Sequence, residues 1–126
     1  MDKNNGAQKN KLNENLLDQY AKKYLVFLQF EKRLSKNTID AYWNDLKRYI
    51  NYLNDFFKIQ SPNKIRIKHI REFANLLNTT PILRSGSIGV QTTTLHRAFS
   101  SIRGFHKYLI SEKITTSDPT IFLESP

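Results

Sequence analysis

Apolar side chains recur at helical spacing in four separate segments of this chain, and that recurrence limits the fold more than any other feature. One segment holds the apolar set Ile39, Tyr42, Trp43, Leu46, Tyr49, Ile50 and Leu53. Spacings of three and four place such a set on one face of a helix. The same reasoning predicts helices at roughly 15–33, 36–55, 66–78 and 91–112. No segment alternates as a strand would, so we expect an all-α fold with four helices around one core.

The length of 126 residues fits a single small domain. We expect a disordered leader at 1–14, because that stretch is polar and has no periodicity. The domain should occupy 15–114. Pro119 cannot continue a helix and biases Asp118 toward extended geometry, so 115–126 is interpreted as a linker toward a further domain.

Composition excludes several classes of protein. The chain has no cysteine, which rules out a disulfide scaffold and a thiolate metal site. No apolar run approaches the roughly 20 residues that a membrane span needs. From these features we expect a soluble, cytoplasmic protein with no membrane partner.

The positive charge is concentrated in one part of the sequence. The formal net charge is +9, and residues 63–110 hold eight bases against the single acid Glu72, which is +7 of that total. The bases are Lys64, Arg66, Lys68, Arg71, Arg84, Arg97, Arg103 and Lys107. A clustered excess attracts phosphate or another anion, although part of it could be a solvated surface.

The sequence shows no group of residues that could form an active site within this chain. The three histidines, His69, His96 and His106, fall on different predicted faces or helices, and His106 lies near a core stripe, where we interpret it as a packed histidine. There is no glycine-rich phosphate loop, and the acids are scattered among bases. We therefore expect no active site, metal site, cofactor or small-molecule ligand in this chain.

Two stretches resemble the N-terminal core-binding domain of tyrosine recombinases and phage integrases, also called the SAM-like domain, and the Xer recombinases in particular. They are SKNTIDAYWNDLKRYINYL, from Ser35, and TLHRAFSSIRGFHKYLISEKITTSDPTIFLESP, from Thr94. The resemblance implies an orthogonal four-helix bundle that grips double-stranded DNA, together with other recombinase protomers on the same site. It also implies that a C-terminal domain, whose Arg, His-x-x-Arg and Tyr are absent here, cleaves and rejoins the strands. This chain alone would then bind DNA without being an enzyme.

The expected DNA-binding residues come partly from helical spacing and partly from the resemblance. In the helix at 91–112, positions 93, 97, 100, 104 and 107 share one face. By resemblance the segment at 36–55 contributes a second group. The full expected set is Lys36, Asn37, Thr38, Tyr42, Arg84, Ser85, Gln91, Thr92, Thr93, Thr94, Arg97, Ser100, Arg103 and Lys107. Tyr42 is ambiguous, because its ring lies on the core side of the helix.

Small residues on the last helix have two interpretations. Ser100, Ser101 and Gly104 could keep the face low so that a sugar-phosphate backbone approaches closely. Alternatively, Gly104 fits against a neighbouring helix.

We further expect that replacing Arg97 and Arg103 by alanine weakens DNA binding without unfolding the helices.

One alternative function stays open at this point. A helical protein-interaction module with a basic face would also explain the composition, and the aromatic pair Phe27 and Phe30 favours some protein contact. An independent helix-turn-helix repressor fits less well, because the short turn between two helices is missing.

Overall fold

The computed structural model describes residues 15–79 and 92–124, and within them all regular secondary structure is helical. The elements are α2 at Leu16–Phe30, α3 at Lys36–Phe57, the short 3-10 helix η1 at Pro62–Lys64, α4 at Ile67–Thr79 and α5 at Thr92–Ser111. No strand occurs in these residues. The predicted all-α fold with four helices is confirmed.

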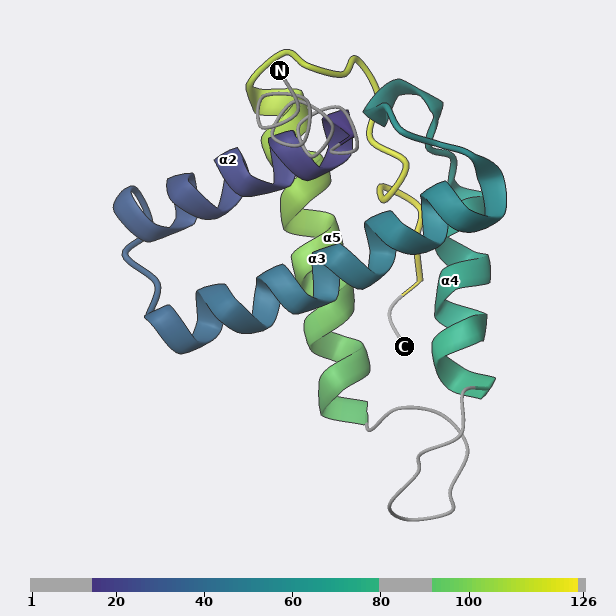
Figure 1. The fold of residues 1–126 in the computed structure, drawn as a ribbon, viewed down its shortest axis with the longest axis horizontal. Helices are drawn as coiled ribbons and strands as arrows, with labels where there is room; N and C mark the ends of the chain where they lie inside the picture. The colour runs from purple at the N-terminus through teal and green to yellow at the C-terminus, as the bar shows by residue number, and fades with distance from the viewer. Residues whose placement is uncertain (1–14, 80–91, 125–126) are drawn as a thin grey trace, which may run out of the picture.

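The helices form an orthogonal arrangement (Figure 1). α2 and α3 are joined by a short turn and run side by side, and both cross α5 at a steep angle. α4 packs against α3 and runs beside α5 on the far side from the α2–α3 turn. α3 therefore lies at the centre, in contact with each of the other three helices.

The core lies where α3 and α5 cross, and it is built from the predicted stripes. Tyr49 and Phe105 are fully buried, and the ring of Phe73 of α4 packs at a tilt against Tyr49 with ring centroids 5.5 Å apart. His106 is buried beside them and forms a hydrogen bond with the Tyr49 hydroxyl at 2.9 Å. The interpretation of His106 as a packed histidine is confirmed.

Local signals explain where the helices begin and end. Ser35 caps α3, because its hydroxyl accepts a hydrogen bond from the Thr38 amide at 3.2 Å. α3 continues to Phe57, beyond the predicted end, and stops where Lys58 adopts a left-handed conformation with φ 57°. α2 ends at Phe30, earlier than predicted, and Arg33 in the following turn has φ 54°.

The segment after α5 is packed against the helices and is not an extended strand. We call residues 115–124 the C-terminal strap. It buries Thr115, Thr120 and Leu123, and Asp118 closes a turn by accepting hydrogen bonds from the Thr120 amide at 2.8 Å and hydroxyl at 2.6 Å. Figure 1 shows the strap running back between α5 and α4. The interpretation of 115–126 as a linker toward a further domain stays a prediction.

Candidate nucleic-acid interface

The outer face of α5 carries a row of exposed polar side chains, which we call the α5 ridge: Thr93, His96, Ser100 and Lys107. These positions are separated by three, four and seven residues, so they follow one side of the helix. Leu95, Ile102 and Leu109 occupy the opposite, buried side. The ridge therefore offers hydroxyl, imidazole and ammonium groups to a partner.

The first turn of α3 presents a second group of donors. Lys36 and Asn37 are exposed, and the pairing of Lys36 with Asp40 at 3.1 Å joins two solvent-exposed side chains. Such an exposed ion pair contributes little, so Lys36 can turn to another anion at small cost. The Ser35 hydroxyl donates to the Thr38 hydroxyl at 3.0 Å, which leaves the Thr38 proton available for an outside acceptor.

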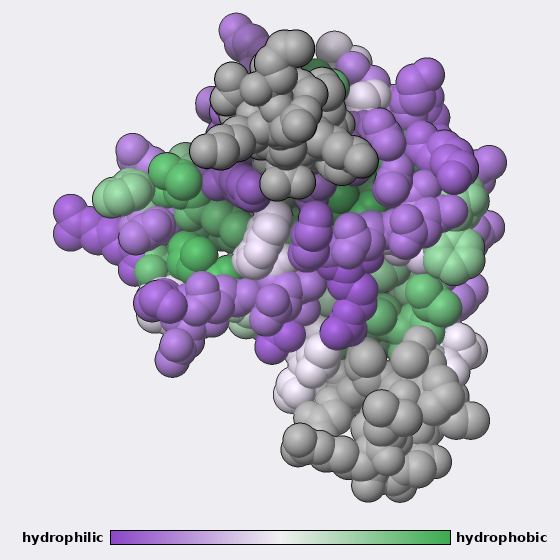
Figure 2. Space-filling model, in the orientation of Figure 1, coloured by the Kyte–Doolittle hydropathy of each residue, from purple (hydrophilic) through white to green (hydrophobic). Residues whose placement is uncertain are grey.

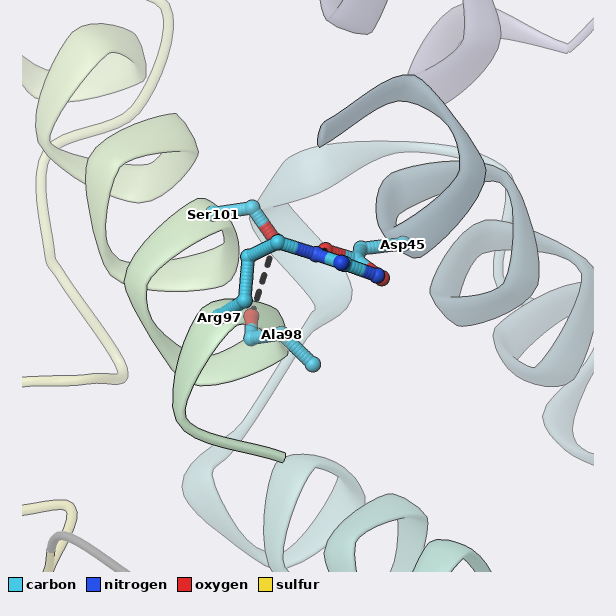
Figure 3. Close-up of polar contacts among 4 residues, drawn as sticks. All are labelled: Asp45, Arg97, Ala98 and Ser101. Atoms are coloured by element: carbon cyan, nitrogen blue, oxygen red, sulfur yellow. Dashed lines mark hydrogen bonds and ion pairs between the residues drawn. The ribbon is translucent and has the colours of Figure 1, made fainter. Parts of the chain in front are cut away.

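Arg97 lies at the edge of the α5 ridge, where it joins α5 to α3 (Figure 3). Its Nε donates to Asp45 Oδ2 at 2.8 Å and its Nη2 donates to Asp45 Oδ1 at 3.0 Å. The hydrogen bonds to Asp45 raise the pKa of Arg97. The Asp45 side chain is 3% exposed, whereas that of Arg97 is 41% exposed. Arg97 is therefore a structural clamp as well as a cation near the surface.

Arg103 is held at the other edge of α5. Its Nη2 donates to the backbone carbonyl of Leu123 in the strap at 2.7 Å, and its guanidinium stacks over the Phe99 ring at 5.5 Å. The side chain is half-buried. Arg103 thus lies beside the α5 ridge but is committed to the strap.

Two small residues of α5 do not belong to the surface, contrary to one of our expectations. Ser101 is fully buried and its hydroxyl donates to the Ala98 carbonyl at 2.9 Å. Gly104 faces Tyr24 of α2: a Cβ at this position would overlap the Tyr24 hydroxyl and lie 3.2 Å from the ring carbon Cζ. The close approach at Gly104 is between two helices of this chain, so the alternative interpretation is the correct one.

The remaining expected residues are placed as follows. Thr92 is exposed, and Thr94 and Tyr42 are half-buried. Tyr42 packs against the core and lies near Arg97, where its phenol contributes to the raised pKa of that arginine, after the hydrogen bonds to Asp45. Arg84, Ser85 and Gln91 lie outside the described residues. Contact of any of these side chains with DNA stays a prediction.

The described residues contain no cluster of His, Asp, Glu or Cys side chains that could hold a metal ion. Nor does any described helix have both the length and the apolar character to cross a membrane. The buried histidine is not poised for proton transfer at neutral pH, because burial lowers the pKa of His106 to about 4.

Comparison with known proteins identifies the family. Residues 21–113 match the family described as phage integrase, N-terminal SAM-like domain. The chain belongs to this family.

Full-length relatives of this SAM-like domain are recombinases. The chain is 35% identical over 111 residues to tyrosine recombinase XerD of Oceanobacillus iheyensis, covering 88% of the chain and 35% of the relative. It is 39% identical over 103 residues to tyrosine recombinase XerD of Staphylococcus epidermidis, covering 82% of the chain and 32% of the relative. The chain thus spans about a third of the length of the curated relatives it matches. No solved structure matches significantly.

One residue of this SAM-like domain was missed in the sequence. Asp45 was treated as part of a motif and given no role, yet it is a buried carboxylate that ties α3 to α5. A signal was present, because Asp45 adjoins Leu46 at the edge of the apolar stripe. A charge at that position needs a partner from another element.

Other surfaces of this SAM-like domain also carry exposed apolar or basic side chains. Val26 and Phe30 are 54% and 69% exposed on α2, so half of the expected aromatic edge faces solvent, while Phe27 packs on Tyr108. Figure 2 shows hydrophilic residues along α3 and hydrophobic ones between α2 and α3 near their turn. Near the start of α4, Lys64 and Lys68 are exposed.

Proposed function

We propose that this chain binds double-stranded DNA through the α5 ridge and the first turn of α3, as the DNA-gripping module of a site-specific tyrosine recombinase. Exposed Lys, Thr, Ser and Asn side chains are the donors that proteins use on phosphate oxygens. The clustered positive charge of the chain adds a long-range attraction for the same partner.

The observation that carries the proposal is the clamp between Asp45 and Arg97. It fastens the second turn of α5 to the third turn of α3, so the exposed first turns of both helices extend from one fixed crossing point. Two helix starts with open donors, held rigidly to each other, suit a rigid polyanion better than a mobile peptide. Fixed donors lose little conformational entropy when they bind.

The rest of the reaction would belong to other parts of a recombinase. We propose that a C-terminal domain supplies the Arg, His-x-x-Arg and Tyr of strand cleavage and rejoining, and that other protomers occupy the same DNA site. The reaction would take place in the cytoplasm and use no cofactor. The relatives' name, tyrosine recombinase, supports the recombinase part of this proposal.

A charge placed on the ridge tests the proposal. Fluorescence anisotropy with a labelled duplex at low salt should show binding that weakens steeply as salt increases. Ser100→Asp puts a carboxylate on the exposed ridge and should weaken binding about fivefold or more, because it meets phosphate at close range.

The matched control is Gln29→Asp, which adds the same charge at an exposed position of α2. This variant should bind almost as the unchanged chain does. Equal losses in the two variants would show that only net charge matters, and no binding to duplex at low salt would refute the proposed function.

A second candidate is a protein-interaction module, favoured by the exposed Val26 and Phe30 on α2. It becomes the better account if duplex binding is absent and an acidic protein binds instead, with affinity that falls when Phe30 is replaced by serine.

A further inference from the structure

Among the described residues, the carboxylate of Asp45 is a buried charge with a single cationic partner. Its side chain is 3% exposed, and among the described residues only Arg97 donates hydrogen bonds to it. A buried carboxylate is costly unless it is paired and hydrogen-bonded. Asp45 and Arg97 therefore fix each other's orientation.

The way in which Arg97 is held leaves part of its guanidinium unused. The Nε and Nη2 atoms of Arg97 donate hydrogen bonds to the two carboxylate oxygens of Asp45, so the carboxylate occupies one edge of the planar guanidinium. A guanidinium has five N–H donors, and the edge formed by Nη1 and Nη2 can receive a second oxyanion at the same time. Within the described residues no other group accepts from Arg97.

The location of the unused edge suits a phosphate group. Arg97 is 41% exposed although its partner is buried, and Figure 3 shows its side chain reaching from α5 toward Asp45 on α3. The exposed Thr93 and Ser100 lie one turn before and one turn after it on α5. A phosphate bound by these hydroxyls would be within reach of the guanidinium.

We propose that Asp45 is a positioning residue for DNA binding: it holds the guanidinium of Arg97 so that the remaining edge receives one backbone phosphate. This inference rests on the proposed function. Asp45 touches no DNA itself and acts only through Arg97.

One variant, Asp45→Asn, separates the positioning role from the effect of charge alone, because the two predict opposite changes in DNA affinity. Asp45→Asn removes a negative charge close to a polyanion, which by charge alone tightens binding. If Asp45 positions Arg97, the same change weakens binding, because an amide oxygen accepts only one of the two N–H bonds and the guanidinium loses its fixed orientation. The direction of the change is the informative result.

The chain contains a closely matched control pair. Asp18 of α2 is paired with Lys47 of α3 at 3.0 Å, and their side chains are 8% and 43% exposed. Asp18→Asn therefore removes the same charge from a similarly buried ion pair that joins a different pair of helices. It reproduces the loss of charge and any loss of stability without touching Arg97.

The experiment measures the dissociation constants of the unchanged chain, Asp45→Asn and Asp18→Asn for one labelled duplex by fluorescence anisotropy, after urea unfolding has shown that each is folded at the temperature used. We expect Asp45→Asn to bind about tenfold more weakly, which is the loss of about one charge-assisted hydrogen bond. Asp18→Asn should bind as tightly as the unchanged chain or more tightly.

A second variant tests the positioning role of Asp45 even if Asp45→Asn fails to fold. Arg97→Lys keeps the charge and an ion pair with Asp45 but loses the second edge. It should weaken binding by a similar factor, and because one phosphate contact is lost, the slope of log affinity against log salt should fall by about 1.

Each outcome bears on a different claim. Tighter or equal binding by Asp45→Asn, or full affinity in Arg97→Lys, would overturn the positioning role while duplex binding by the unchanged chain still supports the proposed function. If the unchanged chain does not bind duplex, both fail.

Discussion

At the scale of single residues, the buried pair of His106 and Tyr49 shows how burial shifts the pKa of a side chain. The ring of His106 is 1% exposed and its Nε2 lies 2.9 Å from the Tyr49 hydroxyl. Burial is the main reason that the pKa of His106 is lowered to about 4 and that the pKa of Tyr49 is raised. The folded chain therefore keeps this histidine neutral where the unfolded chain takes up a proton.

A loss of stability in weak acid follows from the lowered pKa of His106. Below pH 6.5 the unfolded chain binds a proton that the folded chain refuses until about pH 4, so the stability present at neutral pH falls across this window. The free energy of unfolding should decrease by about 2 kcal/mol between pH 7.5 and pH 5. Urea unfolding at the two pH values measures it.

The control for this prediction is His106→Gln, which should lose most of the difference between the two pH values. A residual slope is expected from His69, whose pKa is also lowered, mainly by burial. An unchanged slope in His106→Gln would show that other groups cause the acid sensitivity.

Single residues also show which contacts can be predicted from the sequence and which cannot. Ser35 could be recognised as a helix cap because its partner Thr38 is three positions away. The Asp45–Arg97 clamp could not be recognised in this way, because its partners are 52 positions apart and meet only once α3 and α5 cross. For the same reason Gly104 was ambiguous until Tyr24 was seen to lie against it.

At the scale of elements, the contacts between helices change how arginine substitutions must be interpreted. We expected Arg97→Ala with Arg103→Ala to spare the fold. The structure shows that Arg97 neutralises a buried carboxylate and that Arg103 fastens the strap at the Leu123 carbonyl. These contacts lead us to expect a loss of stability from Arg97→Ala, and whether the helices stay folded remains a prediction.

Arg97→Ala should destabilise the domain by about 3 kcal/mol, because it leaves Asp45 buried without its cation. Arg103→Ala should cost about 1 kcal/mol, because it removes one hydrogen bond to the strap. Urea unfolding followed by circular dichroism measures both. Equal, small losses in the two variants would contradict the assigned role of the Asp45–Arg97 clamp.

The helices themselves were predictable from the sequence, since each carries its own apolar stripe. The strap was not, because its anchors are isolated. Leu123 is a single buried side chain, and the pairing of Glu124 with Arg71 at 3.0 Å joins residues 53 positions apart. A short segment with scattered anchors has no periodicity to detect.

At the scale of the whole molecule, the basic character of the chain is divided between available and committed cations. Arg103 and Arg71 each hold another part of the fold, and Arg97 gives one edge of its guanidinium to Asp45, whereas Lys107 and Lys36 lie on exposed surface. The net charge of +9 therefore overstates the number of cations that can bind phosphate without rearrangement. DNA binding by this domain should depend on the positions of its hydrogen-bond donors as well as on its net charge.

The location of the DNA surface is the central claim, and nuclear magnetic resonance tests it most directly. A ¹⁵N-labelled sample titrated with a short duplex at low salt should show amide shift changes concentrated in residues 36–42 and 92–103, with little change around Val26 and Phe30. Shift changes centred instead on α2, or on Lys64 and Lys68 near the start of α4, would contradict the account.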